Sequence, residues 1–161
     1  MKAIDEIVAH FHALRGGEIQ VAVLPAPHRP VALPPGRQGV YAFLYDDTWL
    51  KIGKAGPNSQ ARWVSQHYTL NGAPSTLAWA LAQYAYTFPR TFPGLPDEVK
   101  AQVCAVPLEE IGTWIKRHTT RVNLTIPADH GPEVLAQLER IALRVLRPVF
   151  EGYWKQRRGA P

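Results

Sequence analysis

The sequence predicts a small α/β (α+β) domain in which a β-hairpin feeds into helices. Apolar and aromatic side chains alternate with a period of two in segments 39–45 and 49–54, the pattern of strands, and segment 46–48 has turn composition. Segment 121–126 alternates in the same way. Segment 133–147 instead repeats its apolar residues at helical spacing, and these patterns together favour a sheet packed against helices.

Length and composition indicate one globular domain. A chain of 161 residues can bury a real core, and 46% apolar with 19% charged residues argues against a disordered chain. The net charge of +5 suits a polyanionic partner such as nucleic acid. A modest basic excess also occurs in proteins that bind nothing acidic, so charge alone does not identify the partner.

The sequence also bears on redox chemistry and location. The single cysteine, Cys104, excludes an internal disulfide and a cysteine-based zinc cluster, and we expect it to be a small core residue. No run of about 18 apolar residues occurs. Asp5, Glu6 and His10 interrupt the start of the chain, where a signal peptide would be apolar. We therefore expect a soluble, cytoplasmic protein with no membrane partner.

The first part of the chain, 1–36, is expected to form an N-terminal extension. Residues 2–14 have the spacing of a short amphipathic helix, which two glycines then end. Segment 18–24 is predicted to be a strand. The proline-rich segment 25–35 has no periodicity, and we expect an ordered loop that wraps around the domain.

The middle of the chain is harder to assign. Segment 76–86 is apolar and aromatic, so either a helix or a buried strand fits it. Segment 88–96 contains three prolines and is predicted to be a loop. Segment 108–118 is predicted to be helical.

Two tripeptides on the predicted hairpin, Gly39-Val40-Tyr41 and Lys51-Ile52-Gly53, carry a resemblance to a known family. Lys54 follows the second tripeptide, Arg62 lies in the next predicted helix, and Glu139 lies in the helix that Pro148 ends. In this order the elements resemble the GIY-YIG nuclease superfamily over residues 37–152. Each tripeptide alone is a weak signal, but the ordered set is specific.

The resemblance implies a fold and a division of the chain. It implies a small three-stranded sheet flanked by helices, with 121–126 as the third strand. Residues 37–152 would be the nuclease domain, and residues from about 70 to 120 a helical insertion. Residues 153–161 would be a basic C-terminal tail.

The resemblance also implies a metal-dependent DNA endonuclease. Tyr41 would act as general base, Arg62 and Lys54 would contact the scissile phosphate, and Glu139 would hold Mg²⁺ (or Mn²⁺). The residue types suit these roles, because a guanidinium matches phosphate geometry and Mg²⁺ prefers carboxylate oxygen.

The position of Glu139 on its helix can be read from the sequence alone. At about 100° per residue, Glu139 falls at the flank of the apolar arc of 133–147 instead of on the polar side. A partly desolvated carboxylate needs a cationic partner or a metal. A salt bridge to an internal arginine is the alternative to the metal.

Two positions depart from the pattern of the family. Lys51 replaces the tyrosine of the second tripeptide, and we expect it to lie opposite Tyr41, where an ammonium would favour the phenolate. Alternatively, Lys51 contacts phosphate. Glu151 stands where an asparagine is common, and it is either a second metal ligand or a surface change without consequence.

Other candidates lie outside the main motifs. His67 is a candidate catalytic residue by analogy with restriction enzymes of this family, although on an ideal helix it would point about 140° away from Arg62. In the tail, Lys155, Arg157 and Arg158 are expected to contact DNA phosphates.

The expected partner is DNA, with duplex, single-stranded and branched substrates all left open. For a duplex target, a symmetric homodimer would place two sites on opposite strands. The rival function is a DNA- or protein-binding module that kept this fold and lost catalysis. The rival does not require Tyr41, Lys54, Arg62 and Glu139 to converge in space.

Overall fold

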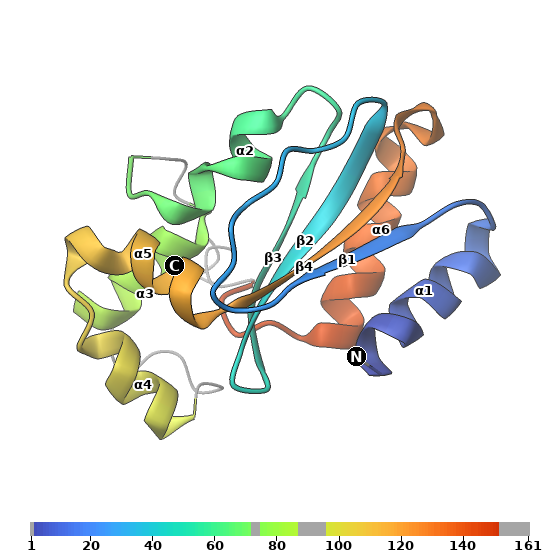
Figure 1. Cartoon of the computed structure of the whole chain (residues 1–161). Helices are drawn as coiled ribbons and strands as arrows, with labels where there is room; N and C mark the ends of the chain where they lie inside the picture. Colours follow the sequence, from blue (N-terminus) through green and yellow to red (C-terminus); the bar gives the residue numbers. More distant parts are fainter. Residues whose placement is uncertain (1, 72–74, 87–95, 152–161) are drawn as a thin grey trace, which may run out of the picture.

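The computed structural model describes residues 2–71, 75–86 and 96–151, and its centre is a four-stranded antiparallel sheet (Figure 1). The strands follow the order β1-β4-β2-β3. They are β1 (Gln20–Leu24), β2 (Arg37–Tyr45), β3 (Thr48–Ala55) and β4 (Thr120–Pro127). The α/β class is confirmed. The sheet has one strand more than the three expected, because the strand predicted in the N-terminal extension pairs with β4 and joins the same sheet.

Helices cover both faces of this sheet. The α-helices are α1 (Lys2–Arg15), α2 (Gln60–Val64), α3 (Leu77–Tyr86), α4 (Asp97–Cys104), α5 (Ile111–His118) and α6 (Gly131–Leu146). A short 3-10 turn, η1 (Gln66–Tyr68), follows α2, and two others, η2 (Leu108–Glu110) and η3 (Ala128–His130), precede α5 and α6. The ambiguity over segment 76–86 is resolved in favour of a helix.

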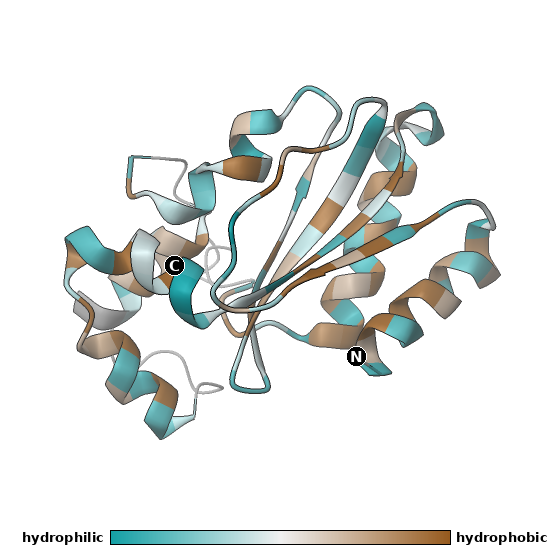
Figure 2. Cartoon of the chain, viewed as in Figure 1, coloured by the Kyte–Doolittle hydropathy of each residue, from teal (hydrophilic) through white to brown (hydrophobic). Residues whose placement is uncertain are grey.

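Alternation along the strands divides the interior into two cores. On β2, Tyr41 and Phe43 face the layer formed by α2 to α5, whereas Val40 and Ala42 face α1 and α6. α1 and α6 carry both apolar and polar residues (Figure 2), and their apolar residues belong to the same core as Val40 and Ala42. The sheet is therefore covered on both sides, and its outer strand β3 is in contact with both layers.

Some predicted features are absent or lie elsewhere. Cys104 is exposed at the end of α4, so the expectation of a core cysteine is wrong. The predicted loop 88–96 lies almost wholly outside the described residues, as does the basic tail 153–161. Within the described part of the chain, no helix is long and apolar enough to cross a membrane.

The proline-rich segment is held against the domain by a buried histidine, His28. Its Nδ1–H donates to the carbonyl of Thr119 (2.6 Å), so its Nε2 accepts a hydrogen bond from the hydroxyl of Tyr68 (2.9 Å). That hydroxyl in turn accepts a hydrogen bond from Arg121 (3.1 Å). Burial lowers the pKa of His28 below its ordinary value of 6.5, and the Thr119 carbonyl opposes this shift.

Protonation of His28 should therefore weaken the fold in acid. Because the unfolded chain binds the proton more tightly, the stabilisation is complete above pH 6.5 and is lost as the pH falls toward the lower pKa of the folded state. In urea unfolding, we expect His28→Gln to be less stable by about 1–2 kcal/mol at pH 7.5. We also expect it to lose less stability than the parent between pH 7.5 and 5.5.

The matched control is His10→Gln, since His10 is exposed on α1. This control should keep the pH dependence of the parent. An equal pH dependence in His28→Gln and the parent would contradict the assignment.

Candidate functional site

The candidate site begins where the predicted hairpin brings an aromatic ring over a glycine. β2 and β3 pair so that Tyr41 is opposite Gly53 and Phe43 is opposite Lys51. A Cβ on Gly53 would collide with the ring of Tyr41, and a Cβ on Gly39 would come within 2.6 Å of the Leu124 carbonyl oxygen. Both motif glycines are therefore required by close packing within the sheet.

The hydroxyl of Tyr41 is fixed by His67. The distance from Tyr41 Oη to His67 Nε2 is 2.6 Å, and His67 Nδ1 accepts the backbone N–H of Leu77 (3.1 Å). Because Nδ1 is an acceptor, the neutral ring carries its proton on Nε2 and donates it to Tyr41. Burial, aided by the positive charges of Lys51, Arg62 and Arg121, lowers the pKa of His67 well below 6.5.

The expectation that His67 points away from Arg62 is wrong for a local reason. α2 ends at Val64, and His67 lies in the separate turn η1. Its position relative to Arg62 is therefore not set by 100° steps along one helix.

The pKa of Tyr41 moves away from the value that a base would need. Burial raises the pKa of Tyr41 to about 12, while Arg62 and Arg121 act to lower it and Glu139 acts to raise it. The side chain is fully buried, so the hydroxyl stays protonated at neutral pH. In this state Tyr41 is a positioned phenol, not a phenolate.

An ion pair lies at the open side of the site, between β3 and α6. The distance from Lys54 Nζ to Glu139 Oε2 is 2.6 Å, and Arg62 Nε donates to the backbone carbonyl of Lys54 (3.1 Å). The Lys54 and Glu139 side chains are 41% and 23% exposed. Glu139 thus has a cationic partner, as its place on the helix predicted, and this partner is a lysine instead of an arginine.

Lys54 and Glu139 line a hollow with a volume of about 460 Å³. Its lining residues are Lys54, Glu133, Ala136, Gln137, Glu139 and Arg140. Within the described residues, no group of three or more His, Cys, Asp or Glu could hold a metal. The two carboxylates that line the hollow, Glu133 and Glu139, suit a hard cation of the Mg²⁺ kind. Such a cation needs only one or two carboxylates, because water and phosphate oxygens complete its coordination.

Lys51 does not occupy the position that the sequence predicted. Its strand partner is Phe43, because the register of the hairpin shifts between Phe43 and Leu44. Lys51 is only 5% exposed, and its Nζ lies 2.8 Å from Glu151 Oε1, which also accepts the backbone N–H of Ile52 (3.2 Å). The expected pairing with Tyr41 is wrong, and Glu151, whose side chain is 27% exposed, is an ion-pair partner of Lys51 instead of a surface change without consequence.

Arg121 is a part of the site region that the sequence reasoning missed. This side chain is fully buried on β4, and its guanidinium carbon lies 5.0 Å from the ring centres of both Tyr41 and Trp63. It donates to Asn123 Oδ1 (2.8 Å) and also to the hydroxyl of Tyr68. The signal was present in the alternation of 121–126, which places the polar residues of β4 on one face, but the pattern does not tell which face is buried.

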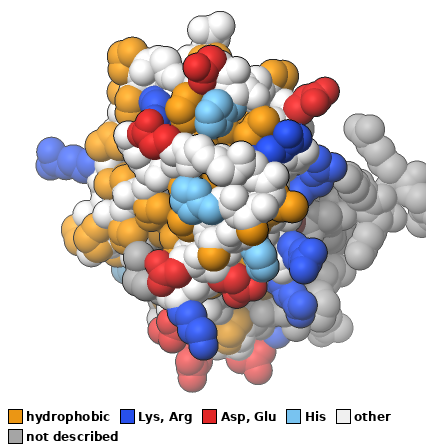
Figure 3. Space-filling view, turned by 90° about the vertical axis from the view of Figure 1, so that its right-hand side faces the viewer, with side chains coloured by type: hydrophobic (Ala, Val, Ile, Leu, Met, Phe, Trp, Pro, Cys, Tyr) orange, Lys and Arg blue, Asp and Glu red, His pale blue; other side chains and the backbone are white. Residues whose placement is uncertain are grey.

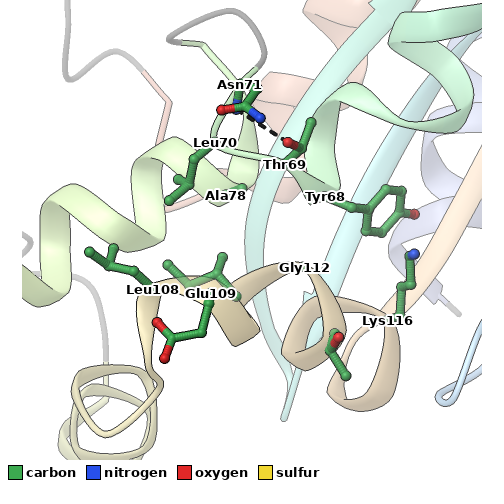
Figure 4. Close-up of a pocket in the computed structure, with 11 residues that line it drawn as sticks. Tyr68, Thr69, Leu70, Asn71, Ala78, Leu108, Glu109, Gly112 and Lys116 are labelled. Carbon is green, nitrogen blue, oxygen red and sulfur yellow. Dashed lines mark hydrogen bonds between the residues drawn. The ribbon is translucent and has the colours of Figure 1, made fainter.

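A second pocket lies apart from the predicted site residues, between η1 and α5 (Figure 4). Its volume is about 320 Å³, and it lies where a Cβ on Gly112 would collide with the carbonyl of Tyr68. Lys116 points toward Tyr68 at one end, with its Nζ 5.3 Å from the centre of the ring (Figure 4). None of the sequence-predicted site residues lines this pocket.

The structure thus brings together Tyr41, Lys54, Arg62, His67 and Glu139, and it places Lys51 opposite Phe43 instead of Tyr41. The three tail residues Lys155, Arg157 and Arg158 lie outside the described residues. In comparisons with known proteins, the chain matches no family model, no curated protein and no solved structure.

The buried hydrogen bond between Tyr41 and His67 should be visible as an energetic coupling. Tyr41→Phe leaves the Nε2–H of His67 without its acceptor, and we expect a loss of about 1–3 kcal/mol in the free energy of unfolding. In a double-mutant cycle with His67→Leu, the two losses should be non-additive by at least about 0.5 kcal/mol. Additive losses, measured by urea denaturation, would show that the pair does not interact.

Proposed function

We propose that this chain is a metal-dependent DNA endonuclease of the GIY-YIG type, which hydrolyses phosphodiester bonds. One observation carries the proposal: Tyr41, Lys54, Arg62 and Glu139 come from four different elements and meet at β3. Lys54 pairs with Glu139, Arg62 bonds the backbone of Lys54, and both Arg62 and Glu139 act on the hydroxyl of Tyr41. In this proposal β2, β3 and β4 are the three-stranded core of the family, and β1 is an addition from the N-terminal extension.

Each side chain has a role that its surroundings support. Arg62 would grip the scissile phosphate through its planar donors, and Lys54 would add a point charge once it leaves Glu139. Glu139 would hold Mg²⁺ or Mn²⁺, and the bound ion supplies charge neutralisation at the phosphate and a more acidic water. Arg62 and Lys54 thus bind and orient the same phosphate from the open side of the site.

Tyr41 would accept the proton of the attacking water from its phenolate form, after its own hydroxyl proton has passed to solvent. Its burial opposes this role, whereas Arg62 and Arg121 favour it because their charges stabilise a phenolate. His67 would be a positioning residue, since it holds the hydroxyl of Tyr41 and is itself only 1% exposed.

The second candidate is a DNA- or protein-binding module on the same fold. Two observations favour it: the pKa of Tyr41 is raised, and Glu139 is already occupied by Lys54. The test is to incubate the chain with duplex, single-stranded, nicked and branched DNA, in Mg²⁺ and in EDTA. Cleavage only in Mg²⁺ is the expected result, and binding without cleavage under all conditions would favour the module.

Glu139→Gln should abolish the metal-dependent cleavage and leave the fold intact. The amide keeps the shape and can still accept a hydrogen bond from Lys54, but it is a poorer ligand for a hard cation. Because the pair is partly exposed, the change in unfolding free energy should stay within about 1 kcal/mol. Cleavage at the parental rate would show that Glu139 does not hold the metal.

Arg62→Lys should reduce the cleavage rate far more than DNA binding. Lysine keeps the charge but loses the two-pronged donor geometry, so a rate loss of order 10²-fold is expected from an interaction made in the transition state. Single-turnover rates and the DNA dissociation constant should be measured on the same preparation. If both fall by the same factor, Arg62 only tethers the substrate.

A further inference from the structure

Three shallow hollows join end to end along helix α6. The hollow at Lys54 and Glu139 shares Gln137 and Arg140 with a second one of about 410 Å³. The second shares Leu14 and Ile141 with a third of about 230 Å³. We call this continuous depression, which runs from the candidate site between the two helices, the α1–α6 groove.

The groove has an apolar floor. Ile141 is half-buried between the two helices, and Leu14 remains 67% exposed although it belongs to the apolar side of an amphipathic helix. Leu14 and Ile141 together therefore give the hollows between α1 and α6 an apolar lining.

The margins of the groove are basic. Arg140 and Arg144 are exposed and lie one helical turn apart on α6, about 6 Å along its axis. Arg15 faces them from α1 and donates to Gln137 Oε1 (2.7 Å). In the ranges that the structure describes, none of these three arginines forms an ion pair. Figure 3 looks at the side of the molecule where α1 and α6 lie, and several Lys and Arg side chains gather along its right-hand margin.

Acidic lining is confined to the end at the candidate site. There Glu139 is neutralised by Lys54, and Glu133 is the other acidic residue that lines the hollows. Away from this end, the described lining carries only positive or neutral side chains.

We propose that the α1–α6 groove binds the sugar–phosphate backbone of a DNA strand that leads into the candidate site. Arg140 would contact the phosphate closer to the site, and Arg144 and Arg15 the phosphates beyond it. This inference rests on the proposed function, because the continuity of the groove with the Lys54–Glu139 hollow is what favours a nucleic acid over an acidic peptide. Contacts of this kind position the strand without reading its sequence.

The test measures DNA affinity by fluorescence anisotropy in EDTA over a series of salt concentrations. For Arg140→Ala/Arg144→Ala, we expect weaker binding and a slope of log K against log [salt] that is smaller by about 2, one for each phosphate that the variant no longer neutralises. Arg140→Lys/Arg144→Lys keeps the charges and should keep most of the slope. The matched control, Arg29→Ala/Arg117→Ala, removes two exposed charges from the loop 25–36 and from α5, and should keep the parental slope.

The outcomes separate this inference from the proposed function. An equal loss of affinity in the groove variant and the control would show an effect of net charge alone and overturn the groove. Unchanged binding in the groove variant, or no DNA binding by the parent in EDTA, would also overturn the groove. So would displacement of the labelled DNA by an acidic peptide at a lower concentration than by unlabelled DNA. Cleavage by the parent in Mg²⁺ would still support the nuclease in those cases. Groove-dependent binding without cleavage would overturn the nuclease and keep the groove.

Discussion

A guanidinium buried without a carboxylate is the constraint on which the interior depends. Removing a charge from water costs several kcal/mol, and among the described residues Arg121 has no acidic partner to offset this cost. It is stabilised instead by the faces of Tyr41 and Trp63 and by neutral acceptors on Asn123 and Tyr68. Burial lowers the pKa of the nearby His28 and His67, and the charge of Arg121 adds to this shift, so both histidines stay neutral.

The site spans both layers of the protein because of one strand. Tyr41 belongs to the core on one face of the sheet, and Glu139 belongs to the helix on the other face. They interact across β3, where the Tyr41 ring packs over Gly53 on one face and Lys54 pairs with Glu139 on the other. Tyr41 and His67 are buried and uncharged, whereas the edge at Lys54 and Glu139 is partly exposed and charged.

Long periodic segments could be predicted from the sequence, but their partners could not. The alternation of 39–54 and 121–126 and the helical spacing of 133–147 gave the correct elements, because each buries one face. Segment 76–86 is apolar all round, so periodicity could not distinguish helix from strand. The convergence at β3 followed from the motifs. The neighbours of Lys51 did not: a regular hairpin turning at Asp46-Asp47 would place Lys51 opposite Ala42, and the bulge, which leaves no mark in the sequence, places it opposite Phe43.

Lys51 and Glu151 are best understood as one structural unit. Lys51 is almost fully buried, and an ammonium at such a position requires a compensating carboxylate. Glu151 provides it from the segment after α6, where the backbone of Val149 and Phe150 also bonds to β3. Either residue without the other would leave a charge uncompensated at the edge of the sheet. The lysine therefore secures the C-terminal segment to β3, and its charge adds to the burial that lowers the pKa of His67.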